Sequence, residues 1–251
     1  MSGQPTSYAQ NVVNLNEMKE RIITFGLRYA PVNADYSVPG LETLITNSQQ
    51  ALSLTNAAIN AQKNTTGIFK MGMAIFTKII TRSFNILAIC GASEQIVQQG
   101  RAILRDVRGQ RIALPIPPEP PPGEGTEPEP TTNVRHIGTM DFKLESMGRY
   151  VQFITEVGEY NPNEPDLKVL AMTEFLAELQ AINADAKRNE ALAIAARRNR
   201  DVIMFIVITG LYDVQKGVKR YTKAVFGPNS TEYISIRGFR FTNKKLEIVN
   251  T

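Results

Sequence analysis

Residues 41–87 read LETLITNSQQALSLTNAAINAQKNTTGIFKMGMAIFTKIITRSFNIL. Apolar or small side chains recur here at alternating intervals of four and three positions, which places them along one face of an α-helix. This face, the first seam, comprises Leu41, Ile45, Ser48, Leu52, Thr55, Ile59, Gln62, Thr66, Phe69, Met73, Phe76, Ile80, Ser83 and Leu87. The spacing predicts a helix of roughly 40 residues or more, about 60 Å long.

A second stretch repeats this spacing and predicts a second helix of similar length. Its seam comprises Leu167, Ala171, Phe175, Leu179, Ile182, Ala186, Asn189, Ala193, Ala196, Arg200 and Ile203. Shorter helices are expected on either side of each long one, at 14–29 and 93–108 and at 139–158 and 210–226. The predicted fold is all-α, an elongated four-helix-like bundle of two similar halves, each short helix, long helix, short helix. Polar seam positions and Gly67 predict a thinner, more flexible or kinked middle.

The segment 115–130, PIPPEPPPGEGTEPEP, separates the two halves. Closely spaced prolines fix φ and remove backbone donors, so this segment is expected to be an extended, acidic spacer rather than a helix. The predicted organisation is a first helical half at 1–112, a proline-rich acidic linker at 113–138, a second helical half at 139–227 and a C-terminal arm at 228–251. A docking role for the linker is less favoured, because readers of PxxP motifs usually want flanking basic residues.

The two halves share weak internal similarity, which predicts a duplication. Tyrosines precede both long helices, at Tyr29 and Tyr36 and at Tyr150 and Tyr160. Both long patterns pass through an Asn/Ala-rich stretch, at 56–61 and 181–186, and then meet a glycine, at 91 or 210. Each half ends in a basic turn with glycine, so one half is expected to be a copy of the other.

Several segments resemble an uncharacterised family of duplicated helical-bundle proteins common in Bacteroidota. In the first half the resemblance lies in Ser83–Leu87, Gly91–Val97 and Val107–Arg111. In the second half it lies in Tyr160–Glu164, Asp166–Val169, Leu179–Ala181, Ala196–Arg197, Asn199–Arg200, Thr209–Leu211, Val218–Lys219, Tyr221, Ala224–Gly227, Ser230, Glu232–Tyr233 and Phe241. The resemblance implies a bacterial, soluble helical protein and supplies no activity, while the long acidic linker leaves open how tightly the halves associate.

The residues for most site chemistries are scarce, so we expect no enzyme activity, no cofactor and no metal. The chain has one histidine, His136 beside the linker, and one cysteine, Cys90 in an apolar run. Metal centres and Ser-His or Cys-His nucleophiles need several such groups together. The carboxylate pairs at helical spacing are expected to be solvated faces: Glu17 with Glu20, Glu156 with Glu159, and Glu174 with Glu178.

The expected function is that of a structural or protein-interaction module, self-associating or bound to another protein, with no small-molecule substrate. No signal peptide or transmembrane helix is recognised, so a cytoplasmic location is expected. The apolar runs at 67–92 and 202–211 leave a membrane-active, pore-forming-like protein as an alternative, although central helices buried on all sides are favoured. A nucleic-acid-associated scaffold is a further alternative, because the net charge is +4, but nucleic-acid contact at Arg197–Arg200 is not favoured, since nearby acidic residues can pair with it.

The C-terminal arm carries the candidate interaction residues, namely Tyr233, Ile236, Phe239, Phe241, Arg237 and Arg240. Alternating apolar residues predict a β-like arm after the helix that ends near Gly227. Its apolar surface is too large to leave in water. Either the arm folds back on the bundle end, pairing with 108–114, or it binds a neighbouring molecule, and fold-back is favoured.

Overall fold

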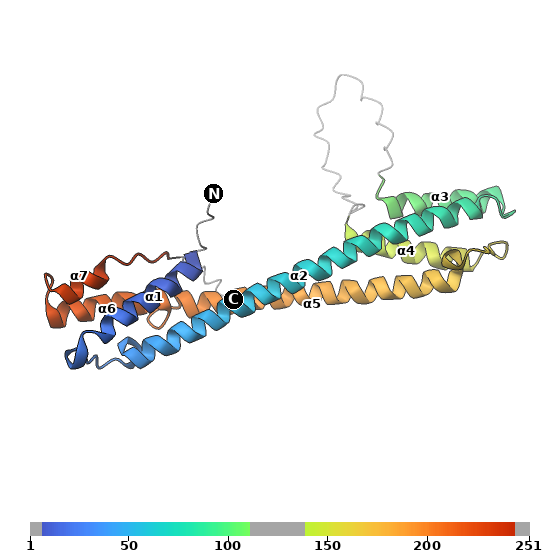
Figure 1. Ribbon diagram of the computed structural model, residues 1–251. Helices are drawn as coiled ribbons and strands as arrows, with labels where there is room; N and C mark the ends of the chain where they lie inside the picture. The colour runs from blue at the N-terminus through green and yellow to red at the C-terminus, as the bar shows by residue number, and fades with distance from the viewer. Residues whose placement is uncertain (1–6, 111–138, 244–251) are drawn as a thin grey trace, which may run out of the picture. The chain divides into compact units, whose positions relative to one another are not determined.

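The computed structural model describes residues 7–110 and 139–243, and this part of the chain is all-helical, without a β-strand. Figure 1 shows the helices α1 Ser7–Ile23, α2 Val38–Leu87, α3 Glu94–Arg108, α4 Met140–Thr155, α5 Val169–Phe205, α6 Leu211–Phe226 and α7 Thr231–Arg237. Three short 3-10 turns lie at η1 Gly26–Arg28, η2 Ala34–Tyr36 and η3 Pro165–Leu167. The predicted all-α class is therefore confirmed.

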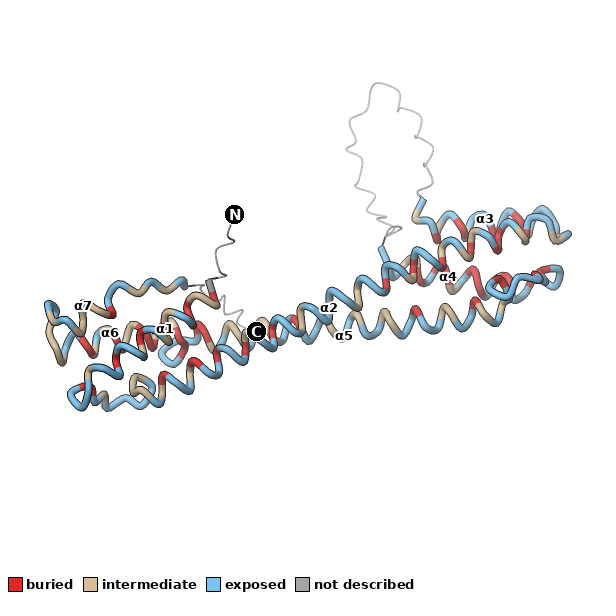
Figure 2. Tube along the Cα trace, in the orientation of Figure 1, coloured by how far each residue is buried: buried red, intermediate tan, exposed pale blue. Residues whose placement is uncertain are grey.

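The two long helices bury the faces that the sequence predicts. Every position of both seams is buried or half-buried, and Figure 2 shows buried residues recurring along α2. Helix α2 has 50 residues and passes through Gly67 without interruption. Helix α5 has 37 residues, which is shorter than predicted, because the chain leaves the helix after Phe205. The predicted seams thus hold along their whole length, whereas the length of the second helix was overestimated.

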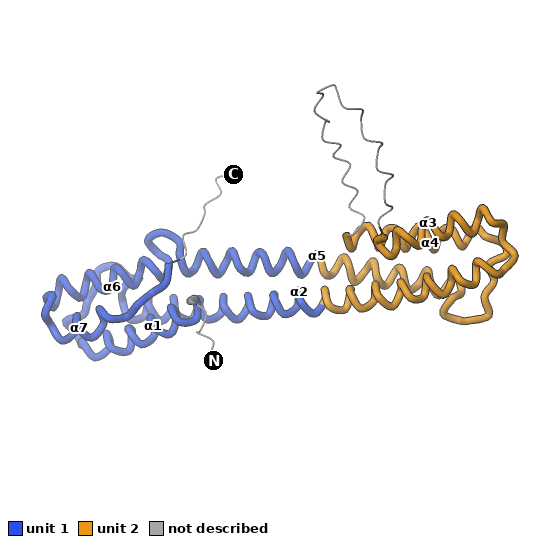
Figure 3. The backbone as a smooth tube through the Cα atoms, turned by 90° about the horizontal axis from the view of Figure 1, so that it is seen from above, with its two compact units in different colours: residues 1–64, 187–251 blue, residues 65–186 orange. Residues whose placement is uncertain are grey.

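The chain forms two compact units, which Figure 3 distinguishes by colour. Unit 1 consists of Met1–Asn64 and Lys187–Thr251, and unit 2 consists of Thr65–Ala186. Each unit therefore draws on both predicted halves, and α2 and α5 each contribute residues to both units. The linker at 113–138 lies outside the described residues. The division into two halves stays a prediction about the sequence rather than a description of the compact units.

Unit 1 packs α1, α6 and α7 with the first part of α2 and the end of α5. Its core contains Leu15, Leu41, Met204 and Val214, together with Ile236 of α7. Aromatic rings close the core near the start of α2, where Tyr29 meets Tyr221 edge-on at 5.2 Å between centroids. Alongside α2, Thr55 donates from Oγ1 to the carbonyl of Ala196 at 3.1 Å, which ties α2 to α5 directly.

Unit 2 packs α3 and α4 with the second part of α2 and the start of α5. Phe76 and Phe175 stack in its core with centroids 5.0 Å apart. A polar chain is buried beside them: Tyr160 donates to the carbonyl of Leu167 at 2.9 Å and lies 2.6 Å from Ser83 Oγ. Since the Tyr160 proton is committed to Leu167, Ser83 donates to Tyr160 and accepts from Tyr150, 3.1 Å away. Burial raises the pKa of both tyrosines, which keeps them protonated as hydrogen-bond donors.

The β-like form predicted for the C-terminal arm is wrong, because residues 231–237 form helix α7. Ser230 caps this helix by accepting from the Tyr233 N–H at 3.1 Å, and Glu232 lies in the first turn, where the helix dipole favours negative charge. These two local signals outweigh the alternation of apolar residues. Residues 111–114, part of the segment expected to pair with the arm, lie outside the described residues.

The expectation that both apolar runs are buried on all sides is also wrong. In the first run, Ile68, Met71 and Ile75 are exposed at helical spacing on α2, and Ile89 is exposed in the turn after it. In the second run, the chain leaves α5 at Phe205 and exposes the aliphatic residues that follow. Each run is therefore richer in apolar residues than its own seam requires, and the surplus reaches the surface.

Candidate interaction site

The structure places the six predicted interaction residues of the arm in different environments. Ile236 is fully buried in the core of unit 1, and Tyr233, Phe239 and Phe241 are half-buried. The remaining two, Arg237 and Arg240, are exposed. The apolar members of this set therefore already pack within unit 1, and only the arginines are fully presented to solvent.

Polar contacts hold the arm against α1 and α6. Asn11 exchanges two hydrogen bonds with the backbone of Thr242, donating to its carbonyl at 2.8 Å and accepting from its N–H at 2.9 Å. Lys219 donates from Nζ to the carbonyl of Phe239 at 2.6 Å, and burial lowers the pKa of this lysine. The guanidinium of Arg21 lies 4.6 Å from the centre of the Phe239 ring. The arm is thus folded back on helices rather than extended as a free segment.

An exposed aliphatic cluster at the end of α5 lies in the apolar run that left a membrane-active protein as an alternative, and it was not among the predicted interaction residues. It consists of Val202, Ile206, Val207 and Ile208, which are 44%, 42%, 68% and 67% exposed. We call these four residues the turn patch. The sequence signal for it was an apolar run that continued beyond the position where the helix ends. Exposed aliphatic clusters of this kind mark interaction surfaces.

Ile208 has a backbone conformation that a β-branched residue rarely adopts. Its φ is +77°, and no other non-glycine residue in the described ranges 7–110 and 139–243 has a positive φ. Such a conformation costs about 1–3 kcal/mol and persists only where surrounding contacts impose it. One such contact is the Ile208 N–H, which donates to Asp213 Oδ2 at 3.1 Å. A second constraint is Gly210, whose N–H donates to the Ile206 carbonyl at 2.9 Å.

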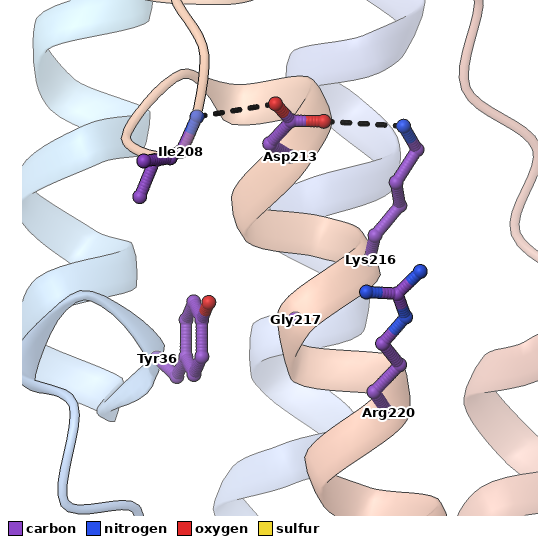
Figure 4. Close-up of a pocket in the computed structure, with 6 residues that line it drawn as sticks. All are labelled: Tyr36, Ile208, Asp213, Lys216, Gly217 and Arg220. Atoms are coloured by element: carbon purple, nitrogen blue, oxygen red, sulfur yellow. Dashed lines mark hydrogen bonds and ion pairs between the residues drawn. The ribbon is translucent and has the colours of Figure 1, made fainter.

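A surface hollow of ≈ 290 Å³ lies beside this strained turn. Figure 4 shows its six lining residues, with the Asp213 carboxylate between the Ile208 nitrogen and the Lys216 amine. The ring of Tyr36 closes one side against Gly217, where an added Cβ would lie 2.3 Å from the ring. A residue larger than glycine at 217 would therefore displace Tyr36 from the hollow.

The charged side chains of the hollow differ in their surroundings: Asp213 and Lys216 pair with each other, whereas Arg220 is exposed. Asp213 accepts from the Ile208 N–H and, at 3.1 Å, from Lys216 Nζ, and these two bonds hold the pKa of its carboxyl below the ordinary value. Lys216 also lies 4.0 Å from the centre of the Tyr212 ring. Arg220 is exposed on the rim. The site therefore combines an aliphatic surface with a cationic rim, a composition suited to binding rather than to acid–base chemistry.

None of the remaining sequence candidates among residues 7–110 and 139–243 lines this hollow. All six carboxylates of the predicted pairs are exposed, as expected for solvated faces. In the described ranges no three His, Cys, Asp or Glu residues gather into a potential metal site. Cys90 is half-buried and donates to the Leu87 carbonyl, and Arg200 pairs with Asp201. The one histidine, His136, lies outside the described residues.

The chain matches no known family model, no curated protein and no solved structure. The resemblance to a Bacteroidota family therefore stays a prediction. Among the helices within residues 7–110 and 139–243, none combines the length and the apolar character needed to cross a bilayer.

Proposed function

We propose that this chain is a non-enzymatic helical module that binds protein, and that the turn patch is the surface through which copies of it associate. The observation that carries the proposal is Ile208, an exposed aliphatic residue in a left-handed conformation. Asparagine or glycine would fit that conformation with less strain. The side chain is 67% exposed, so little of it is buried within unit 1 to offset the strain, which supports a role in contact with another molecule.

The outward face of α5 extends this surface. Leu192, Ala195, Asn199 and Val202 of α5 follow one another at intervals of three and four, Ile206 continues the series just beyond the helix, and all five are exposed. This is the spacing by which one helix packs along another. A second copy that presents the same stripe supplies the matching surface in a symmetric dimer, because the same patch then serves both partners. The proposed partner is therefore another copy of the chain.

Sedimentation velocity and light scattering over a range of protein concentrations test this proposal. The wild-type chain is expected to form a reversible dimer, and the double variant Val207→Ser/Ile208→Asn is expected to remain monomeric. Ile89→Ser is the matched control, because Ile89 is 83% exposed in the corresponding turn of unit 2. A wild-type chain that stays monomeric at all concentrations, or equal loss of dimer with Ile89→Ser, would contradict the proposal.

A role at a membrane surface is a second candidate, favoured by the cationic residues beside the turn patch. Lys216 and Arg220 line the hollow next to Ile208, and aliphatic residues flanked by cations suit the interface of an anionic bilayer. Sedimentation with anionic liposomes and release of trapped dye test it. Binding that Val207→Ser/Ile208→Asn abolishes would favour this candidate, and an inert wild-type chain would remove it.

We also propose that the two halves of the sequence are copies. Tyr29 donates to the carbonyl of Tyr36, and Tyr160 donates to the carbonyl of Leu167, in both cases seven residues further on. Tyr36 and Leu167 each end a 3-10 turn directly before a long helix. This correspondence matches Tyr29 with Tyr160, a pairing that supports a duplication. A cytoplasmic location is part of the proposal and rests on the sequence alone.

A further inference from the structure

A groove lined by three arginines lies in unit 2, between helix α3 and the C-terminal end of helix α2. It has a volume of ≈ 360 Å³, and its rim carries Arg101, Arg105 and Arg108 of α3. All three are exposed and follow one another at helical spacing, so they project from one side of the helix. Phe84 and Leu104, both buried, form an apolar floor beneath them.

The positive charge of this groove is not neutralised within the described residues. Arg108 donates to the hydroxyl of Thr81 at 3.3 Å, whereas neither Arg101 nor Arg105 has a side-chain partner among residues 7–110 and 139–243. Asp106 lies on the same helix but pairs with Arg149 of α4 at 3.0 Å. The groove therefore presents guanidinium groups that are available for an anionic ligand.

The wall formed by α2 offers one further donor to an anion. Asn85 lines the groove and is exposed, so its side-chain amide can donate a hydrogen bond. The end of α3 gives Arg105 and Arg108 a second role, because cations in the last turn stabilise the helix dipole. That role does not account for Arg101, which lies outside the last turn.

The spacing of the arginines selects the kind of anion. Seven residues separate Arg101 from Arg108, which corresponds to about 10 Å along the helix. Carboxylates three residues apart in an extended peptide span about the same distance. The neighbouring Arg82 is already paired with Asp166, so it does not add a free guanidinium to those of the groove. A short ligand with separate carboxylates fits this arrangement better than a long polyphosphate chain.

We propose that the groove between α2 and α3 binds an acidic, extended peptide segment of a partner protein. Its carboxylates pair with Arg101, Arg105 and Arg108, and the residues between them lie over Phe84 and Leu104. The surface is separate in sequence and in unit from the turn patch, so it requires neither dimerisation nor membrane binding. The sequence of residues 115–130 has the same acidic, proline-rich chemistry and supplies a natural probe.

The test measures binding of a fluorescein-labelled peptide with the sequence of residues 115–130 by fluorescence anisotropy at low salt. The full chain is used with Glu119, Glu124, Glu127 and Glu129 changed to Gln, which removes competition from its own acidic segment. We expect saturable binding that weakens with salt, and no binding of a peptide that carries Gln in place of each Glu. Adding Arg101→Gln and Arg105→Gln is expected to weaken binding about tenfold.

Arg237→Gln/Arg240→Gln is the matched control, because it removes the same charge from two exposed arginines of unit 1. Circular dichroism melting checks that the variants remain folded. The proposal would be overturned if both double variants lost the same amount of peptide affinity. It would also be overturned if the chain that carries only the four Glu→Gln changes did not bind the peptide. Binding of heparin through the same arginines without binding of the acidic peptide would overturn it too, since the groove would then be a polyanion site.

Discussion

The turn between α2 and α3 and the turn between α5 and α6 both connect two helices, but they differ in the residue with positive φ and in the capping of the next helix. Each contains a residue with positive φ, but this residue is Gly91 in the first turn and Ile208 in the second. The first turn then caps its next helix with Ser93, whose hydroxyl accepts from the Ile96 N–H. The second turn has Gly210 at the N-cap, which offers no side chain, and the Asp213 carboxylate of α6 instead accepts from the Ile208 N–H in the turn.

The turn of unit 1 has the more strained backbone, because an isoleucine rather than a glycine adopts the positive φ. The proposed duplication would match Gly91 with Gly210, yet of these two only Gly91 uses the conformational freedom of glycine, since Gly210 has φ −71°. Gly210 is needed for space instead. Strain that a simple substitution would remove is typical of functional positions. Substitutions in the two units test this contrast.

Gly210→Ala is expected to have the largest effect. Its Cβ would lie 2.6 Å from the Ile206 carbonyl oxygen and 2.7 Å from the Ile206 nitrogen, and the backbone cannot move away without breaking the turn. We expect a loss of about 3 kcal/mol in the free energy of unfolding. Gly91→Ala meets no neighbouring atom and should cost only about 1 kcal/mol, from its positive φ. Urea denaturation compares them, and equal losses would contradict the assignment of different roles.

Tyr160→Phe is expected to cost more than Tyr29→Phe. The Tyr160 hydroxyl bonds both the Leu167 carbonyl and Ser83, whereas the Tyr29 hydroxyl bonds the Tyr36 carbonyl. Removing the first leaves two buried groups without their partner, at about 2 kcal/mol, and removing the second leaves one, at about 1 kcal/mol. Hydrogen exchange should locate each loss in its own unit. A larger loss for Tyr29→Phe would contradict the difference inferred between the two tyrosines.

Ile208→Asn is expected to raise the free energy of unfolding by about 1 kcal/mol, because asparagine tolerates positive φ. The same change should weaken dimerisation, so stability and association move in opposite directions. Thermal melting at a concentration where the chain is monomeric separates the two effects. A variant that is less stable than the wild-type chain would show that Ile208 packs within unit 1 rather than waiting for a partner.

Asp213 gives the smallest expected effect, which depends on pH. Its pKa is lowered from 3.8 because the folded form stabilises the carboxylate through the Ile208 N–H and then Lys216. The contribution is therefore present above the unfolded value and is lost as pH falls through the lowered folded value. Asp213→Asn should remove this part of the pH dependence. An NMR titration of the carboxyl group checks the sign, and a pKa at or above 3.8 would contradict it.

Periodicity predicted the two long helices well because the side chains that a helix buries recur at a regular spacing. The seam positions from Leu41 to Leu87 are buried or half-buried, and the predicted ends of α3 and α6 lie within one residue of those observed. The arm was mispredicted because the short capping signal of Ser230 competes with an apolar alternation of similar length. Local capping decides the structure there.

The candidate site could not be predicted in the same way. A run of aliphatic residues gives no sign of where its helix ends, so Ile206, Val207 and Ile208 were expected to be buried. Their exposure depends on a turn held by two hydrogen bonds, from the Ile208 N–H to the Asp213 carboxylate and from the Gly210 N–H to the Ile206 carbonyl, and neither bond gives a repeating pattern in the sequence. The groove of α3 was missed for a related reason: its three arginines are unremarkable in sequence until α2 supplies the opposite wall.

The division of the chain into units has a consequence for the order of folding. Unit 2 is one continuous stretch, whereas unit 1 needs Met1–Asn64 and Lys187–Thr251 together. The bonds between Asn11 and Thr242 join residues 231 positions apart. During synthesis the whole of unit 2 is polymerised before the second part of unit 1. Since folding of unit 2 shortens the loop that unit 1 must close, we expect the segment made first to be among the last to find its native contacts.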